Sequence, residues 1–304
     1  MRFKLIVNPT SGRGAAEEAI PALESRFISN NIAFDLVRTE APEHAIELAR
    51  VAAEDGFDVV VAAGGDGTAN EVLNGLMRAK ASGHTAIMGH LAIGRGNDFA
   101  FGCGISPGLD EGCDLLINGE RKFIDVGFVR GGLFPEGRYF GNGVGIGFDA
   151  VVGFEALKMK RLQGFLSYLV AALKTIFLYY KAPYVKLEYG DTVTELNALM
   201  VSVMNGRRMG GGFMMAPESE MNDALLDLCI AEQVSKLGVL ALIPKFMAGT
   251  QSTQPSIRTD RTDEIRVTAI EGSLPAHADG ETLCIEGDQL IIQLLPSQIE
   301  IFAS

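Results

Sequence analysis

The segment with the clearest chemical pattern is Gly64-Gly65-Asp66-Gly67-Thr68. It follows the apolar run 59–63 and precedes residues 69–77, whose apolar positions recur at helical spacing. A junction of strand, glycine turn and helix presents bare backbone N–H groups that favour phosphate. The Asp66 carboxylate would repel phosphate, so its presence predicts a divalent cation between the two. The alternative is an ordinary turn in which Asp66 only caps the helix.

Three other segments carry residues of the same kind. Residues 8–12 and 94–99 each follow a predicted strand, and they combine glycine with Asn, Ser, Arg or Asp. The carboxyl ends of parallel strands share one edge of a sheet, so we expect both segments to meet the glycine turn there. Far along the chain, Asp279-Gly280-Glu281 offers a carboxylate that could accept a proton during phosphoryl transfer. The alternative for Asp-Gly is a hairpin turn.

The elements that must position these residues change in type along the chain. Strands at 3–7, 34–39, 59–63 and 86–93 alternate with helices, one of them at 15–29 with a bend or a late start at Pro21. This alternation predicts a doubly wound parallel α/β sheet. We expect a second, mainly antiparallel β domain, so the predicted domains are 1–127 and 128–295, with 296–304 belonging to either. Its predicted strands are 139–148, 184–189, 195–205, 225–231, 264–269 and 289–295, and its predicted helices are 153–181 and 236–248.

Composition narrows the class of protein. The 304 residues carry a net charge of −12 without a basic stripe, which makes nucleic acid an unsuitable main partner. Four cysteines without a CxxC spacing indicate reduced, buried thiols in a cytosolic protein. The first residues contain no apolar run long enough for a signal peptide.

The most apolar stretch, 162–180, raises the question of a membrane. Gln163, Ser167 and Lys174 interrupt it, so we expect an amphipathic helix and not a membrane span. Residues 155–181 hold five basic residues against one acid, which suits an anionic membrane surface. Burial against the β domain explains the same pattern, and we prefer that interpretation.

Taken in order, the NPxSG segment at 8–12, GGDGT at 64–68, GRGND at 94–98 and DGE at 279–281 give the chain a family resemblance. The chain resembles, over nearly its whole length, the diacylglycerol kinase catalytic family, the bacterial lipid kinases related to sphingosine kinases. The resemblance implies an α/β nucleotide domain, a β-sandwich lipid-binding domain and ATP in the cleft between them. It further implies a cytoplasmic enzyme at the inner face of the membrane that transfers the γ-phosphoryl group of ATP to a lipid hydroxyl with Mg²⁺. Diacylglycerol is the default acceptor, and a homodimer is left open.

The family motifs imply roles for particular residues. Asp66 would reach the catalytic Mg²⁺, and Asp98 would join a carboxylate network near the acceptor hydroxyl, with a helix N-cap as its alternative. The DGE segment would carry the general base, for which we favour Asp279, with Glu281 orienting it or the metal. The nucleotide would be held by Asn8, Pro9, Thr10, Ser11, Gly12, Thr39, Gly64, Gly65, Asp66, Gly67, Thr68 and Glu71.

A second, structural Mg²⁺ is also implied. Asp223 matches the family's aspartate, and the backbone carbonyls of Glu220 and Leu225 would complete the site; a solvated turn is the alternative. Ala224 stands where the family has glycine, which weakens this prediction.

The sequence departs from the family pattern at a second place and leaves other functions open. Ile93 and Arg95 stand where the family has Pro and Thr, and we expect the Arg95 guanidinium to point at phosphate instead. The acceptor could also be a sphingoid base, another lipid alcohol or NAD. A non-catalytic regulator that binds nucleotide or lipid is the remaining alternative.

Overall fold

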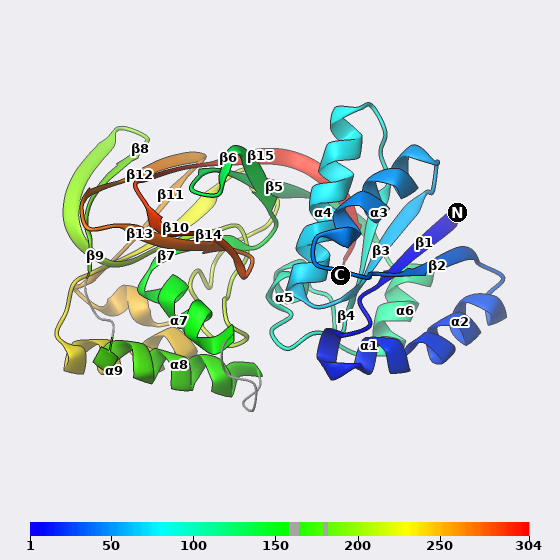
Figure 1. Cartoon of the computed structure of the whole chain (residues 1–304), viewed down its shortest axis with the longest axis horizontal. Helices are drawn as coiled ribbons and strands as arrows, with labels where there is room; N and C mark the ends of the chain where they lie inside the picture. Colours follow the sequence, from blue (N-terminus) through cyan, green and yellow to red (C-terminus); the bar gives the residue numbers. More distant parts are fainter. Residues whose placement is uncertain (158–163, 179–181, 304) are drawn as a thin grey trace. The chain divides into compact units, whose positions relative to one another are not determined.

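The computed structural model describes residues 1–157, 164–178 and 182–303 (Figure 1). The chain forms two compact units, the first from Met1–Val126 with Pro296–Ser304 and the second from Gly127–Leu295. It passes between the units twice, within strand β5 (Arg121–Gly131) and within strand β15 (Gln289–Phe302).

The first unit is built on a parallel sheet in the order β4-β3-β1-β2. The strands are β1 (Arg2–Val7), β2 (Ala33–Arg38), β3 (Val59–Gly64) and β4 (Ile87–Ala92). The central strand β3 is buried at every residue, as a strand covered on both faces should be. The end of β15 returns to this unit, where Ile301 pairs in parallel with Met88 of β4.

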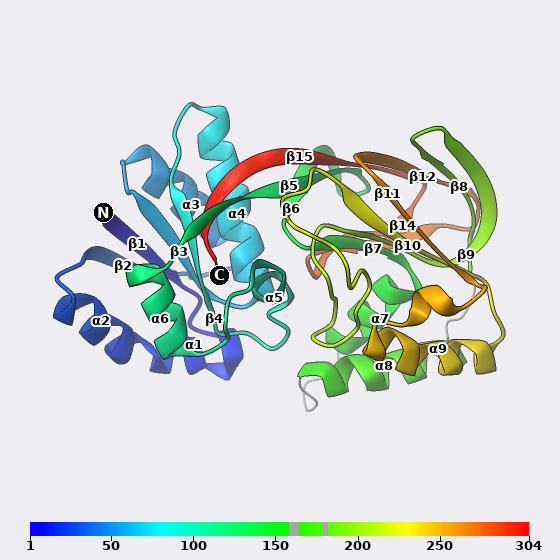
Figure 2. The same ribbon diagram turned by 180° about the vertical axis from the view of Figure 1, so that it is seen from behind.

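Helices cover both faces of this sheet (Figures 1 and 2). On one face lie α1 (Ala15–Glu18), α2 (Ile20–Ser29) and α6 (Leu109–Asn118), and on the other lie α3 (His44–Glu54) and α4 (Asp66–Ala81). The predicted helix 15–29 is divided at Ala19, and Pro21 occupies the first turn of α2. The short helix α5 (Asp98–Cys103) and α6 were not predicted.

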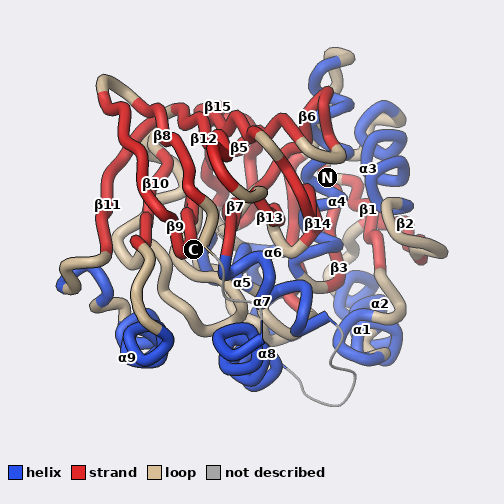
Figure 3. The backbone as a smooth tube through the Cα atoms, turned by 60° about the vertical axis from the view of Figure 1, so that its left-hand side comes forward, coloured by secondary structure: helices blue, strands red, loops and turns tan. Residues whose placement is uncertain are grey.

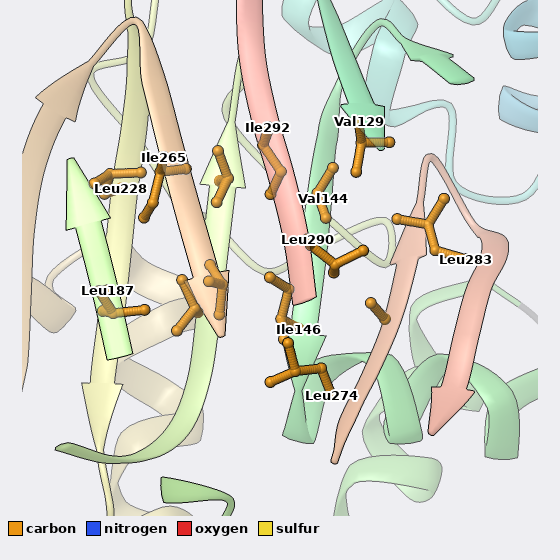
Figure 4. Packing of buried hydrophobic residues seen from close by; sticks show 14 of the residues in the cluster. Val129, Val144, Ile146, Leu187, Leu228, Ile265, Leu274, Leu283, Leu290 and Ile292 are labelled. Carbon is orange, nitrogen blue, oxygen red and sulfur yellow. The ribbon is translucent and has the colours of Figure 1, made fainter. Parts of the chain in front are cut away.

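The second unit is a sandwich of antiparallel sheets that share the long strand β9 (Thr192–Met204). One sheet runs β14-β13-β7-β9-β10-β11 and the other β9-β8-β12-β15-β5-β6. Aliphatic side chains of both sheets form its core, among them Val144, Leu187 and Ile292 (Figure 4). The remaining strands are β6 (Phe134–Phe140), β7 (Gly143–Gly147), β8 (Tyr184–Tyr189), β10 (Leu226–Glu232), β11 (Ile257–Thr262), β12 (Glu264–Glu271), β13 (Leu274–Ala278) and β14 (Glu281–Gly287).

Three helices of the second unit gather on one side of its strands: α7 (Phe148–Leu157), α8 (Gly164–Leu178) and α9 (Lys236–Ala248) (Figure 3). The predicted strand 139–148 is wrong in its bounds, because β6 ends at Phe140 and β7 at Gly147, whose φ of 92° suits only glycine. The predicted helix 153–181 is divided into α7 and α8, and its parts at 158–163 and 179–181 lie outside the described residues. Among the described helices, none is long and apolar enough to cross a membrane.

Candidate functional site

Two of the predicted strand-end loops contact the glycine turn of β3 directly. The Asn8 side-chain amide donates to Thr68 Oγ1 at 3.1 Å, and the backbone N–H of Gly65 donates to Ser11 Oγ at 3.4 Å. The third loop approaches so closely that a Cβ on Gly94 would lie 2.4 Å from the Cα of Gly65. Glycine is therefore required at this crossing, and residues 8–12, 64–68 and 94–98 form one surface at the carboxyl ends of the strands.

Two carboxylates converge beside the first turn of α4. A Cβ on Gly96 would lie 3.0 Å from Asp66 Oδ2 and 3.3 Å from Asp98 Oδ2, so both oxygens border the same residue. Asp66 Oδ1 also accepts the backbone N–H of Phe99 at 3.0 Å, which holds the start of α5 against α4. Asn97, and not Asp98, is the N-cap of α5.

This arrangement fits a divalent cation. Carboxylate oxygens are the ligands that Mg²⁺ prefers, and it takes only one or two of them beside water and substrate phosphate. The described residues hold no group of three or more His, Cys, Asp or Glu side chains that could bind a metal alone. Asp66 and Asp98 are therefore suited to a metal that is bound together with phosphate.

Not all of the other residues predicted to bind the nucleotide lie at the glycine turn. Thr39 follows β2 at the same sheet edge, where its N–H donates to the carbonyl of Val7 at 2.9 Å. The Glu71 carboxylate accepts the N–H groups of Glu43 and Ala45 at 2.9 and 3.0 Å, so it holds the start of α3 instead of lining the glycine turn. The remaining positions are Pro9 and Thr10 in the turn after β1, Gly12 in the short 3₁₀ helix Ser11–Arg13, Gly67 in the first turn of α4, and Arg95, which is exposed.

His90 contacts the glycine turn from the neighbouring strand β4, a role that was not predicted from the sequence. Its ring is buried in β4, and Nε2 donates to the carbonyl of Gly64 at 3.3 Å. Burial lowers the pKa of His90 to about 4, so the imidazole is neutral at pH 7. The strand register, which pairs His90 with Ala62, is the signal that would have revealed it.

In the second unit, the DGE segment is a hairpin turn between β13 and β14. Asp279 and Gly280 have φ of 49° and 87°, both left-handed, as the alternative interpretation anticipated. The Asp279 carboxylate crosses to the chain before β7: Oδ2 accepts the N–H of Gly141 at 2.7 Å, and Oδ1 accepts those of Asn142 and Gly143 at 3.0 and 2.9 Å. Asp279 therefore fastens the turn to a neighbouring segment.

A polar group lies behind this turn. In the sheet, Gly145 pairs with Ser202 on one side and with His277 on the other. A Cβ on Gly145 would lie 2.6 Å from both Asp149 Oδ2 and His277 Nε2, so the glycine makes room for these two atoms. Ser202 Oγ donates to Asp149 Oδ2 at 2.9 Å, and His277 Nδ1 accepts the N–H of Gly280 at 3.4 Å.

Burial shifts the pKa of each ionisable member of this group in the direction that favours its neutral form. It raises the pKa of Asp149 to about 7, against the hydrogen bond from Ser202 that lowers it, and it lowers the pKa of His277 to about 4. Since Nδ1 of His277 accepts a hydrogen bond, its proton belongs on Nε2, facing Asp149. The group thus connects β9 and the start of α7 to the DGE turn.

Of the residues predicted for a structural Mg²⁺, Asp223 lies beside an arginine. Asp223 Oδ2 lies 3.5 Å from the Arg261 guanidinium, which also donates to Asp227 Oδ1 at 2.9 Å, while Glu220 is exposed. Asp223 Oδ1 accepts the N–H of Leu225 at 3.1 Å, and Ala224 between them has a φ of 64°. Asp223 and Asp227 thus share Arg261 as a cation of the chain, which competes with a metal for the Asp223 carboxylate.

Comparisons with known proteins agree with both halves of this architecture. Residues 2–129 match the model of the diacylglycerol kinase catalytic domain, and residues 142–303 match that of the YegS C-terminal NAD kinase beta sandwich-like domain. A protein of Bacillus subtilis named diacylglycerol kinase is 28% identical over 92% of this chain and 89% of its own length. An Enterobacter protein named "Probable lipid kinase YegS-like" is 28% identical over 96% of this chain and 92% of its own.

A solved structure supports the fold. The crystal structure of a diacylglycerol kinase from Bacillus anthracis covers 100% of this chain and 97% of its own with a TM-score of 0.77, at 21% identity. The two family models together extend over most of the chain, in the order that the motifs predicted. The chain therefore belongs to the diacylglycerol kinase catalytic family of lipid kinases.

Proposed function

We propose that this protein transfers the γ-phosphoryl group of ATP to the hydroxyl of diacylglycerol and so forms phosphatidic acid. The observation that carries the proposal is the convergence of Asp66 and Asp98 on Gly96, beside the first turn of α4. The names of its relatives support the acceptor, because they include diacylglycerol kinases of similar length.

The first unit supplies what phosphoryl transfer needs for positioning. Backbone N–H groups in the first turn of α4 would face the polyphosphate, which is favoured at a helix N-terminus. Ser11 and Asn8 hold the turn in shape through their contacts with Gly65 and Thr68. Asp66 and Asp98 would hold Mg²⁺, which would supply positive charge to neutralise the negative charge that develops during phosphoryl transfer.

For the general base we propose Glu281 and not Asp279. The Asp279 carboxylate already accepts three backbone N–H groups, an arrangement that stabilises its charged form and makes it a poor proton acceptor. Glu281 begins β14 directly after the turn, so Asp279 fixes the place from which its side chain extends. Glu281 would take the proton of the acceptor hydroxyl as the new O–P bond forms and the bond between the γ-phosphorus and the bridging oxygen breaks, which releases ADP.

The proposal is tested with γ-labelled ATP, Mg²⁺ and a panel of acceptors that contains diacylglycerol, a sphingoid base, a monoacyl lipid alcohol and NAD. We expect labelled phosphatidic acid, and we expect D66N to abolish it while the protein remains folded by circular dichroism. If only NAD or only the sphingoid base became labelled, that compound and not diacylglycerol would be the acceptor. ATP binding without transfer to any acceptor would favour the non-catalytic regulator.

A further inference from the structure

The proposed mechanism does not use the polar group beside the DGE turn. Its members are Asp149 at the start of α7, Ser202 of β9 and His277 of β13, which meet around Gly145 of β7. Asp149 and Ser202 are buried, and a buried polar group destabilises the fold unless its hydrogen bonds are satisfied. A satisfied polar network also makes the surrounding structure rigid. Three such residues from three separate elements therefore indicate a role beyond packing.

The backbone pairing of the β13–β14 hairpin is irregular close to Glu281. The register shifts between Ala276 and His277, four residues before Glu281 in the case of His277. On the partner strand, Leu283 and Cys284 are both buried although they are neighbours, and Leu283 belongs to the core shown in Figure 4. This is the side-chain arrangement of a β-bulge, which disrupts the ladder locally. The ladder therefore holds only a short piece of the hairpin that carries Glu281.

The His277 imidazole adds a contact at this weak point of the ladder. Its Nδ1 accepts the N–H of Gly280, the residue before Glu281, at 3.4 Å. Gly280 has a φ of 87°, and glycine has more backbone freedom than any other residue, so its conformation needs an external contact to hold it. The Asp279 carboxylate fixes the preceding residue to the chain before β7. Two side chains thus hold the two residues that precede Glu281.

Contacts on two sides of the ring fix the orientation of His277. A Cβ on Gly145 would lie 2.6 Å from Nε2, and a Cβ on Gly153 of α7 would lie 3.8 Å from Cδ2. Asp149 lies on the Nε2 side, where Oδ2 accepts from Ser202 Oγ at 2.9 Å and Oδ1 accepts the N–H of the next residue at 2.8 Å. A carboxylate held in this way favours a proton on Nε2 and leaves the lone pair of Nδ1 for the turn.

We propose that His277, oriented by Asp149, positions the general base Glu281. It does so by accepting the N–H of Gly280, so it acts through the backbone and not on the reacting atoms. The inference rests on the proposed function, because it takes Glu281 as the base. Since a misplacement of about 1 Å can lower a rate by about 10²-fold, the effect should fall on kcat. KM for ATP should not change, because the predicted nucleotide residues belong to the first unit.

His277→Asn and His277→Leu form a matched pair for the first test. Both side chains branch at Cγ, but only asparagine places an acceptor where Nδ1 of the imidazole lies. We expect H277L to lower kcat by about 10–100-fold at an unchanged KM for ATP. H277N should recover most of the wild-type kcat. A role in packing alone would affect both variants alike, so equal kcat values in H277N and H277L would overturn the proposal.

A double-mutant cycle tests whether His277 acts through Glu281. E281Q removes the base, so H277L added to E281Q should lower kcat no further. A further loss as large as the one that H277L causes in the wild-type background would show that His277 acts independently of Glu281, which contradicts the inference.

¹⁵N NMR of histidine-labelled protein reports the state of the ring without any measurement of activity. The chain has four histidines, and the signal of His277 is the one that H277N lacks. The pKa of Asp149 is about 7, so at pH 8 its carboxylate is mostly charged, and we expect a neutral His277 ring with its proton on Nε2. D149N should move part of this proton to Nδ1, because an amide can present either a donor or an acceptor to Nε2. A proton on Nδ1 in the wild type, or an unchanged tautomer in D149N, would refute the orienting role of Asp149.

Gly145 and Gly153 provide a second matched pair. G145A should lower kcat as H277L does, because its methyl group would lie 2.6 Å from both Asp149 Oδ2 and His277 Nε2. G153A places its methyl group at the ordinary contact distance of 3.8 Å and should keep the wild-type kcat. Urea midpoints measured by circular dichroism check that both variants are folded, and a folded G145A with full kcat would count against the inference.

The same assays distinguish a failure of this inference from a failure of the proposed function. Absence of transfer from ATP to any acceptor by the wild type would refute the proposed function. An active wild type in which H277N and H277L lose kcat equally would refute only the positioning role of His277.

Discussion

Substitutions of Asp279 test whether this residue only anchors the DGE turn or also acts as the general base. In D279A, the N–H groups of Gly141, Asn142 and Gly143 lose their acceptor. A hydrogen bond to a charged group contributes about 1.5–3 kcal/mol, and water replaces part of it at a half-buried site, so three of them are together worth about 3 kcal/mol. Alanine at a φ of 49° adds about 1 kcal/mol of strain.

Asparagine is the informative comparison, because it tolerates the left-handed backbone. Its single oxygen can still accept from Asn142 and Gly143, while the amide nitrogen that replaces Oδ2 faces the N–H of Gly141. D279N should therefore lose about half as much unfolding free energy as D279A. E281Q should change that free energy by less than about 0.5 kcal/mol and lower kcat by about 10²–10⁴-fold.

The assay pairs urea unfolding followed by circular dichroism with kcat measured on the accepted lipid. The order of urea midpoints should be wild type and E281Q, then D279N, then D279A. The reasoning is refuted if D279N keeps the wild-type midpoint and loses as much kcat as E281Q, since Asp279 would then be the base.

Two other expectations concern stability. His90 is neutral in the folded state, and its pKa is lowered from 6.5 to about 4, so at this site the unfolded state binds one more proton in that window. The contribution of His90 to the unfolding free energy should therefore fall by about 1.4 kcal/mol per pH unit as pH drops from 6.5 to 4. H90Q should flatten this slope by one proton in urea titrations at a series of pH values, and an unchanged slope would contradict it. R261Q should lower stability by about 2 kcal/mol by leaving Asp223 and the largely buried Asp227 unpaired, with partial recovery in millimolar Mg²⁺. EDTA should leave the wild-type Tm unchanged. A marked fall in Tm would instead indicate that a structural metal is bound.

The elements around the candidate site that were predicted correctly are encoded in short, continuous segments of the chain. Strand, glycine turn and helix around Asp66 are local patterns, and parallel strands bring their carboxyl ends to one edge whatever the details of packing. The α/β and β-sandwich classes and the family were accordingly confirmed. The break near Pro21 is equally local, because the ring blocks a backbone hydrogen bond within the same helix.

The remaining features depend on pairings between distant segments. His90 reaches Gly64 only through the register of β4 on β3, and Arg261 meets Asp227 only because β11 pairs with β10. Likewise, the pairing of β13 with β7 places the Asp279 carboxylate on the N–H groups before β7. The amino-acid sequence was thus sufficient to place the candidate residues at the ends of particular strands. The contacts of each carboxylate followed from the folded structure, because strand register over long separations is set by packing of the whole core and not by neighbouring residues.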